Sequence, residues 1–305
     1  MLRYILPAFL RGSLNMLWVI FGTFLMAILI FSLSLIKYLF PIKPWLRFMS
    51  RVLNFVPTLW GDIMTLGSIL LTKIDIETHG FEKLSRKKSY FMMANHQSWA
   101  DVLLLYRVFN HKVPVLKFFI KSQFIRMPFV GWGCWLMDFP FLKRYTKEQI
   151  AKNPKLKGKD IETTKKMCAR AMQSAMTVVS FTEGTRYRPH KAKRQKSPYQ
   201  YLLRPKAGGI AYTLMVMGDK LDNLLNVTII YPEGKSGFWH YLNGTLPKVI
   251  IKVEEKTITK QIIGDYSEDR EFRVKFQQWL NNLWLEKDKD IAKAIKENSG
   301  KKHEK

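Results

Sequence analysis

Residues 12–36 form a run of 25 residues without a charged side chain, rich in leucine, isoleucine, phenylalanine and methionine. A helix of this length is long enough to span the hydrocarbon core of a bilayer. The run is too long for the apolar core of a signal peptide, and it lacks a small-residue cleavage site. Because buried helices of soluble proteins rarely stay uncharged for so long, we expect a membrane helix.

Basic residues are unevenly distributed around this run. Lys37, Lys43, Arg47 and Arg51 follow it, against Arg3 and Arg11 before it. Positive residues favour the cytoplasmic side of a membrane. We therefore expect an inner (cytoplasmic) membrane protein whose main domain faces the cytoplasm.

A second apolar stretch, residues 52–71, is interrupted by Pro57, Gly61, Asp62 and Gly67. A second full crossing would carry the rest of the chain to the far side of the membrane. We therefore expect an interfacial or re-entrant helix that lies partly in one leaflet. Residues 1–72 together form the predicted membrane-anchoring helices.

The net charge is +26, from 50 Lys and Arg against 24 Asp and Glu. Such an excess indicates an anionic partner: nucleic acid, an anionic membrane surface or a phosphorylated small molecule. Segments 143–170 and 188–206 concentrate the charge, either as solvated loops or as surfaces against lipid headgroups. The membrane helix, and the lack of interleaved aromatic residues that stack on bases, disfavour nucleic acid. Cys134 and Cys168 have no metal-ligand spacing, so no metal site is expected.

After residue 72 the sequence alternates between short apolar strands and helical patterns. This alternation predicts an α/β domain over residues 73–286, with a mainly parallel central sheet flanked by helices. Residues 287–305 are highly charged and are expected to be a helix end fraying into a disordered tail. The expected strands are 74–77, 90–93, 113–118, 135–139, 177–181, 227–231 and 249–253. The expected helices are 98–109, 160–175, 209–216 and 271–285.

His96 and Asp101 lie five residues apart, where the strand at 90–93 is expected to lead into a helix. Five residues at helical pitch would place the side chains about 140° apart, so a single helix cannot pair them. From the turn before the helix, however, the imidazole can fold back toward a carboxylate in the first helical turn. A histidine oriented by a carboxylate is a common general base. Alternatively, Ser98 caps the helix, Asp101 supports the cap, and His96 is only a turn residue.

Residues 182–186 follow the expected strand at 177–181, a position where α/β sheets place ligand contacts. Gly184 permits close backbone approach or a positive φ. Arg186 offers a planar fork suited to phosphate, and Thr185 adds a hydroxyl donor. Glu183 either orients Arg186, contacts a substrate hydroxyl, or pairs with Arg186 to stabilise the turn.

Further cations lie between these two segments. Lys121 precedes an apolar stretch closed by Pro128 and Gly131, and Lys143 and Arg144 follow the next expected strand. These cations could complete a phosphate pocket, or they could lie at the membrane interface with their side chains reaching toward water.

Four segments occur in the order of the blocks of a known family. They are Asn95-His96-x-Ser98-x-x-Asp101, the Lys121, Pro128 and Gly131 segment, Glu183-Gly184-Thr185-Arg186, and the strand at 227–232. On these residues the chain resembles the phospholipid/glycerol acyltransferase family, whose bacterial members include 1-acyl-sn-glycerol-3-phosphate acyltransferases. The resemblance covers roughly residues 74–255, and its first and third blocks are specific in combination.

The resemblance implies that His96 and Asp101 form the acyl-transfer dyad. It implies that residues 183–186 bind the acceptor, with Arg186 on its phosphate. Arg144 stands near the position of a second phosphate contact, although Phe141-Leu142-Lys143-Arg144 departs from the Asp-Arg or Asn-Arg pair common in the family. Thr182 likewise stands where a proline is common.

The implied reaction transfers a fatty acyl group from acyl-CoA or acyl carrier protein to the sn-2 hydroxyl of a lysophosphatidic acid, with no cofactor. Membrane lipids, the lysophosphatidic acid and the acyl donor are the expected partners. One alternative is an acyltransferase for another lysophospholipid acceptor. Outside the enzymes, the alternatives are a basic membrane-surface adaptor and a nucleic-acid-binding protein.

Overall fold

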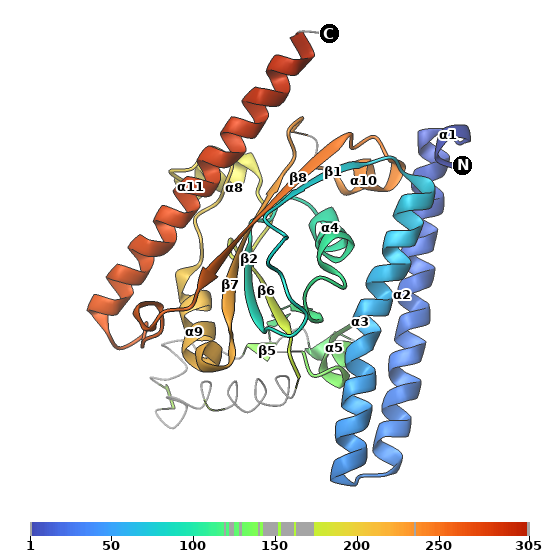
Figure 1. Cartoon of the computed structure of the whole chain (residues 1–305), viewed down its shortest axis with the longest axis vertical. Coiled ribbons are helices and arrows are strands. Elements are labelled where there is room, and N and C mark those ends of the chain that lie inside the picture. The colour runs from blue at the N-terminus through green and yellow to red at the C-terminus, as the bar shows by residue number, and fades with distance from the viewer. Residues whose placement is uncertain are drawn as a thin grey trace.

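The computed structural model of this 305-residue chain describes residues 2–118, 120–121, 125–127, 130–139, 141–142, 152–153, 162, 174–234 and 236–303. A pair of long antiparallel helices lies along one side of an α/β unit, and another long helix crosses the opposite side (Figure 1). The sheet therefore lies between two helical layers.

Helices α2 (Ala8–Leu39) and α3 (Lys43–Leu71) form the hairpin, which the short α1 (Leu2–Ile5) precedes. The two helices touch closely where the Trp18 indole donates to the carbonyl of Ile63 at 2.8 Å. By length and composition, α2 is the one described helix that could cross a membrane. Large apolar side chains remain exposed on both helices, among them Phe21, Phe24, Phe55 and Leu66.

The α/β unit contains a six-stranded sheet in the order β1-β8-β7-β2-β6-β3. Every pairing in it is parallel except that of β7 with β8. The prediction of a mainly parallel sheet flanked by helices is thus confirmed. The strands are β1 (Asp75–His79), β2 (Tyr90–Ala94), β3 (Leu116–Phe118), β6 (Thr177–Phe181), β7 (Asn223–Ile230) and β8 (Lys248–Thr257), and β4 (Ile120–Lys121) pairs separately with β5 (Phe141–Leu142).

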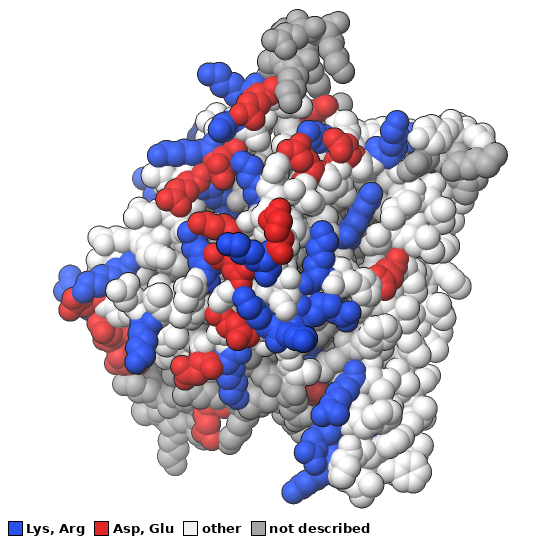
Figure 2. Space-filling view, in the orientation of Figure 1, with Lys and Arg blue, Asp and Glu red and all other residues white. Residues whose placement is uncertain are grey.

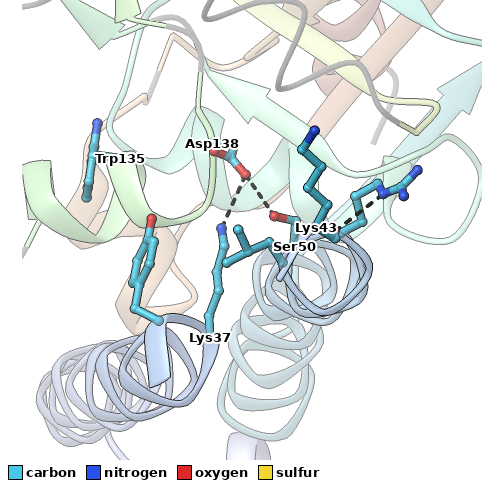
Figure 3. A pocket seen from close by; sticks show the side chains of 8 residues that line it. Lys37, Lys43, Ser50, Trp135 and Asp138 are labelled. Atoms are coloured by element: carbon cyan, nitrogen blue, oxygen red, sulfur yellow. Dashed lines mark hydrogen bonds and ion pairs between the residues drawn. The ribbon is translucent and has the colours of Figure 1, made fainter. Parts of the chain in front are cut away.

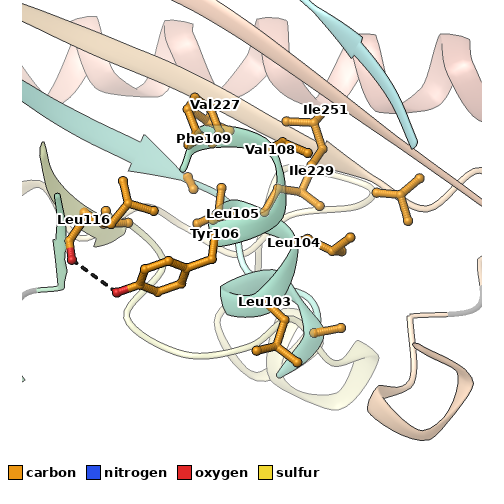
Figure 4. Packing of buried hydrophobic residues seen from close by; sticks show 14 of the residues in the cluster. Leu103, Leu104, Leu105, Tyr106, Val108, Phe109, Leu116, Val227, Ile229 and Ile251 are labelled. Atoms are coloured by element: carbon orange, nitrogen blue, oxygen red, sulfur yellow. Dashed lines mark hydrogen bonds between the residues drawn. The ribbon is translucent and has the colours of Figure 1, made fainter. Parts of the chain in front are cut away.

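Both faces of the sheet are covered, as β2 illustrates. Its residues are all fully buried, and Tyr90 and Met92 pack into a cluster with α4 (Ala100–Phe109). Phe91 and Met93 enter the opposite cluster, with α9 (Ala207–Met217) and α11 (Arg270–His303). A strand covered on both faces is a continuous apolar run rather than an alternating one. In Figure 4, Leu104, Leu105 and Phe109 of α4 face Val227, Ile229 and Ile251 of the sheet.

Both halves of α2 contact the α/β unit. Toward its N-terminus, α10 (Phe238–Asn243) packs against it, and Asn15 Nδ2 donates to the carbonyl of Leu242 at 3.0 Å. Farther along, α5 (Val130–Leu136) packs close to Ile30. The hairpin therefore lies along the unit for most of its length (Figure 1). The remaining short helices are α8 (Pro189–Arg194), η3 (Gly218–Lys220) and η4 (Lys260–Ile262).

Two predicted elements are wrong. Residues 135–139 are not a strand: helix α5 covers 130–136 and a turn follows it. Periodicity alone cannot separate a short apolar strand from a buried helical turn, and the strand of this region comes later, at β5. The expected helix at 160–175 lies almost entirely outside the described residues.

The predicted disordered tail at 287–305 is the second error, because α11 is continuous from Arg270 to His303. Its buried stripe runs through the proposed boundary at residue 286. The side chains in this stripe are Phe276, Leu280, Leu283, Trp284, Lys287, Ile291 and Ala294. Lys287 occupies one of the buried helical positions of this stripe, so the apolar periodicity in the sequence is interrupted there.

Candidate active site

The segments that follow the neighbouring strands β7, β2 and β6 converge at the carboxyl ends of these parallel strands. Strand β2 ends at Ala94, which is in register with Phe181 at the end of β6. Asn95 then bridges to β7: its Nδ2 donates to the carbonyl of Ile229 at 2.9 Å, and its Oδ1 accepts from the Ile229 amide at 2.8 Å. This fully buried side chain extends the β2–β7 ladder by one step and fixes the start of the segment that carries His96.

His96 and Asp101 are brought together as predicted. The Nδ1 atom of His96 lies 2.7 Å from Oδ2 of Asp101. The carboxylate is fully buried, whereas the imidazole side chain keeps 12% of its surface exposed. Because a carboxylate only accepts, the neutral ring carries its proton on Nδ1 and presents Nε2 as an acceptor.

Asp101 also fixes the start of α4. Its Oδ2 accepts from the amides of Gln97 at 2.7 Å and Ser98 at 2.9 Å, while Ser98 Oγ accepts from the amide of Ala100 at 3.1 Å. Helix capping and histidine orientation were set out as alternatives, but one carboxylate performs both. The helix start therefore holds Asp101 in the position that pairs with the imidazole.

Tyr231 supplies a further hydrogen bond to Asp101, from its phenol to Oδ1. The residue lies just past β7 and is 2% exposed. Burial raises the pKa of Tyr231 well above its ordinary value, and the carboxylate of Asp101 raises it further. The phenol therefore stays protonated and donates. Sequence reasoning placed this tyrosine in an apolar strand and in the fourth family block, but gave it no contact with Asp101.

Glu183 does not lie where a substrate contact was predicted. It is fully buried, and its Oε1 accepts from the His96 amide at 3.0 Å while its Oε2 accepts from the Leu203 amide at 2.8 Å. Among the described residues it forms no pair with Arg186, so the interpretation as a Glu–Arg turn also fails. Both carboxylate oxygens are occupied by the backbone, so Glu183 positions the segment that carries His96.

Lys287 of α11 approaches the same buried region. Its side chain is 1% exposed, and its ammonium donates to the carbonyl of Val227 in β7. Burial lowers the pKa of Lys287 to about 7, against the opposing influence of the Glu183 carboxylate. Burial raises the pKa of Glu183 to about 8, against its two backbone hydrogen bonds and the charge of Lys287. The next residue, Asp288, accepts from the amides of Gln200 at 2.9 Å and Tyr201 at 2.8 Å.

The segment after β6 is tied to the one after β2. The amide of Tyr187 donates to the carbonyl of His96 at 2.7 Å, and the guanidinium of Arg188 donates to the carbonyl of Gln97 at 3.2 Å. Gly184 has φ of +70°, so the positive φ predicted for it is present. The Oγ1 atom of Thr185 accepts from Lys191 Nζ at 2.6 Å, and this bond does not use the hydroxyl proton that was predicted to donate.

Arg186 lies at the open side of the site. Its guanidinium carbon is 4.5 Å from the centre of the Trp99 ring, and Trp99 is 59% exposed. None of the described carboxylates pairs with Arg186. The stacked, planar guanidinium thus keeps its hydrogen-bonding edge available for an anion beside the His96 segment.

An aromatic wall borders the imidazole. The rings of His96 and Phe181 are stacked with centroids 3.9 Å apart, and Phe118 continues the stack 5.8 Å from Phe181. Within the described part of the chain, Nε2 of His96 has no hydrogen-bond partner. The site therefore offers a free imidazole nitrogen between an apolar surface and a guanidinium.

The side chains of the two remaining predicted contacts, Lys121 and Arg144, lie outside what the structure describes. Lys121 belongs to β4, which pairs with β5 instead of joining the main sheet. Arg144 and most of the basic segment 143–170 lie outside the described residues. The second basic segment is partly structural, because Arg204 donates to the carbonyls of Gln195 and Lys196 at 3.1 Å.

A family profile described as Acyltransferase matches residues 75–232. The chain is 32% identical over 117 residues to 1-acyl-sn-glycerol-3-phosphate acyltransferase of Saccharomyces cerevisiae, covering 38% of this chain and 34% of that protein. It is 21% identical over 246 residues to 2-acyl-1-lysophosphatidylinositol acyltransferase of the same yeast, covering 66% and 60%. The chain thus spans one third to three fifths of these relatives.

Two further similarities extend over most of the chain. Probable 1-acyl-sn-glycerol-3-phosphate acyltransferase 5 of Arabidopsis thaliana is 23% identical over 294 residues, covering 92% of this chain and 72% of that protein. The crystal structure of the 1-acyl-sn-glycerophosphate (LPA) acyltransferase of Thermotoga maritima superposes with a TM-score of 0.47 and 17% identity, covering 95% of this chain and 98% of that one. The segment matched by the family profile is slightly more than half of the chain, and the chain belongs to the acyltransferase family.

Proposed function

We propose that this acyltransferase is membrane-bound and transfers a fatty acyl group from acyl-CoA or acyl carrier protein to the sn-2 hydroxyl of 1-acyl-sn-glycerol 3-phosphate. The observation that carries the proposal is the arrangement around His96. Its Nδ1 is held by the buried Asp101 at 2.7 Å, its Nε2 is free among the described residues, and Arg186 lies over Trp99 on the adjoining segment. A base and a phosphate-binding cation thus lie on two segments joined by backbone hydrogen bonds.

The proposed mechanism follows from the tautomer of His96, which carries its proton on Nδ1 and can accept one on Nε2. The acceptor hydroxyl is a poor nucleophile at neutral pH, and Nε2 of His96 takes its proton as the oxygen attacks the thioester carbonyl. Asp101 stabilises the imidazolium that forms. The C–S bond then breaks, the thiolate leaves with the electron pair, and the imidazolium proton neutralises it. One base is sufficient, and no covalent acyl-enzyme is required.

Arg186 is the proposed contact for the acceptor phosphate. A guanidinium matches the geometry of phosphate oxygens, and the Trp99 ring holds its plane without using its N–H groups. Glu183 takes a positioning role in this scheme, because it binds the His96 amide from the buried side.

The hairpin is the proposed membrane anchor. Because both halves of α2 contact the α/β unit, a perpendicular crossing would draw that unit into the bilayer. The exposed apolar side chains of α2 and α3 instead support insertion of the outer face of the hairpin into one leaflet. The proposed location is the inner membrane, with the α/β unit in the cytoplasm.

The proposal is tested by incubating the purified full chain in detergent with labelled acyl-CoA and lysophosphatidic acid. We expect His96→Ala to lower turnover about 10²–10⁴-fold at unchanged membrane content, because it removes the base. His111→Asn is a matched control, since His111 also faces a carboxylate, Asp62, at 2.8 Å on the exposed surface. Normal turnover by His96→Ala would remove the assigned base.

A second candidate acceptor is a lysophospholipid with a full headgroup. It is favoured by the alignment with the lysophosphatidylinositol acyltransferase, which covers more of this chain than the alignment with the yeast lysophosphatidic acid enzyme. A panel of acceptors separates the two. With lysophosphatidic acid, Arg186→Ala should mainly raise the acceptor KM, whereas an equal loss with an uncharged acceptor would place Arg186 in another role.

A further inference from the structure

A cavity lies at the turn of the hairpin, away from the His96 site. It has a volume of about 430 Å³, is open to solvent on one side, and is lined by residues from the end of α2, the start of α3, α5 and the turn after α5. In Figure 3 the Lys37 and Lys43 side chains lie on its hairpin side, and Asp138 and Trp135 lie opposite. The hairpin turn and the short helices α8 and α10 lie toward opposite ends of the molecule (Figure 1).

Positive charge is in excess around this cavity. Lys37, Lys43 and Arg47 line it, and among the described lining residues Asp138 is the one carboxylate. Asp138 Oδ2 is 3.8 Å from the ammonium of Lys37 and 3.4 Å from the hydroxyl of Ser50. Within the described part of the chain, no carboxylate pairs with Lys43 or Arg47, so two cations remain for an anion from outside.

The surroundings of the cavity are those of a membrane boundary. Lys37 lies in the last turn of α2, directly after the uncharged run, and Trp135 on the opposite wall is 44% exposed. Tryptophan and basic residues favour the headgroup level of a bilayer. Figure 2 shows basic side chains at this end of the hairpin, beside a hairpin surface that is almost free of charged atoms.

We propose that this cavity binds the phosphate of an anionic membrane phospholipid, as a lipid site distinct from the site of acyl transfer. Arg47 and Lys43 are the cations that contact the phosphate. Trp135 contacts the acyl–headgroup boundary of the same lipid. Binding of the lipid headgroup holds the hairpin turn at a fixed depth in the membrane. The exposed apolar faces of α2 and α3 also bind the membrane, but they do not distinguish between headgroups.

The test is binding of the full chain to vesicles of phosphatidylcholine, with and without a minor fraction of phosphatidylglycerol. The double variant Lys43→Gln, Arg47→Gln should lose about 30-fold in binding to the anionic vesicles, since each basic residue near the surface contributes roughly fivefold. Its binding to pure phosphatidylcholine should not change. The matched control is Lys220→Gln, Lys260→Gln, which removes the same charge from exposed positions elsewhere. Equal losses in the two double variants would overturn the proposal.

Two further measurements keep the outcome unambiguous. Asp138→Asn should strengthen binding to the anionic vesicles about fivefold, because it removes the competing carboxylate. Asparagine tolerates the positive φ of 55° at this position, and a misfolded chain would not gain affinity. If detergent-solubilised chain binds inorganic phosphate through Lys43 and Arg47 while vesicle binding is indifferent to them, the ligand is a free anion and the lipid assignment fails. His96→Ala should bind the vesicles normally, which separates this proposal from the proposed reaction.

Discussion

The His96 site and the hairpin cavity each contain an aspartate, but the surroundings of the two carboxylates differ. Asp101 is fully buried and accepts from an imidazole, two backbone amides and a phenol. Among the described residues, the Asp138 carboxylate makes two long contacts, at 3.4 and 3.8 Å, and three cations line the same cavity. A carboxylate whose oxygens all accept hydrogen bonds, such as that of Asp101, fixes the orientation of its partner. A carboxylate with fewer charges than the cations around it, such as that of Asp138, leaves positive charge available to a ligand.

This difference predicts that turnover at the His96 site is strongly reduced when a single side chain that contacts the imidazole is changed. We expect Asp101→Asn to lower kcat about 10²–10⁴-fold, because a neutral amide no longer stabilises the imidazolium that forms when His96 takes the proton. The weaker acceptor for the amides of Gln97 and Ser98 should also cost about 0.5–1.5 kcal/mol of stability. Steady-state kinetics at saturating acceptor, with thermal unfolding, measure both effects. Asp62→Asn is the control on the exposed His–Asp pair, and a kcat for Asp101→Asn close to that control would contradict the assigned role.

Tyr231→Phe removes one of the donors to Asp101 and leaves the others. A hydrogen bond to a charged group contributes about 1.5–3 kcal/mol, so we expect kcat to fall about tenfold to a hundredfold with little change in the acceptor KM. Tyr106→Phe is the matched control, because its buried phenol donates to a backbone carbonyl, that of Leu116, at 3.3 Å. If the two variants lower kcat equally, Tyr231 acts only through stability.

The smallest expected effect is on stability as a function of pH. Burial lowers the pKa of Lys287 from 10.5 to about 7, so between these values the unfolded chain binds a proton that the folded chain has released. Stability therefore gains from this group as pH rises through that window. Burial raises the pKa of Glu183 from 4.5 to about 8, which makes stability fall as pH rises from 4.5 to 8.

Lys287→Met separates these two contributions. The variant should lose the gain between pH 7 and 10.5 and keep the fall at lower pH, because the burial that raises the pKa of Glu183 remains. Thermal unfolding in detergent, followed by circular dichroism across this range, measures the difference. Lys252→Met is a suitable control, since Lys252 pairs with Asp290 at the surface. An identical pH profile in both variants would show that Lys287 does not titrate in this window.

The parts of the site that depend on local sequence could be predicted. His96 and Asp101 are five residues apart, and a strand followed by a helix brings their side chains together with little help from elsewhere. The fold class was predictable for the same reason, because each buried strand such as β2 is an apolar run bounded by polar turns. The general positions of Gly184 and Arg186 followed from the end of β6.

The contacts that depend on distant segments could not be predicted. Glu183 resembles a ligand-binding carboxylate until Leu203 and the His96 amide are seen to occupy its oxygens. Lys287 resembles part of a solvated tail in the sequence. Lysine side chains are usually exposed, and the sequence does not show the partner that pairs with this one in the interior. Helix α5 was mistaken for a strand because its short apolar run is compatible with both elements.

The far end of the chain has a practical consequence for anyone who prepares this protein. A shortened version ending at residue 286 would delete the ammonium beneath β7 and the carboxylate of Asp288 that anchors Gln200 and Tyr201. The backbone that supplies the Leu203 amide to Glu183 would lose its anchor. The charged composition of residues 287–305 suggests a segment that can be removed. Its removal would nevertheless disturb the position of His96, because Glu183 binds both the Leu203 amide and the His96 amide.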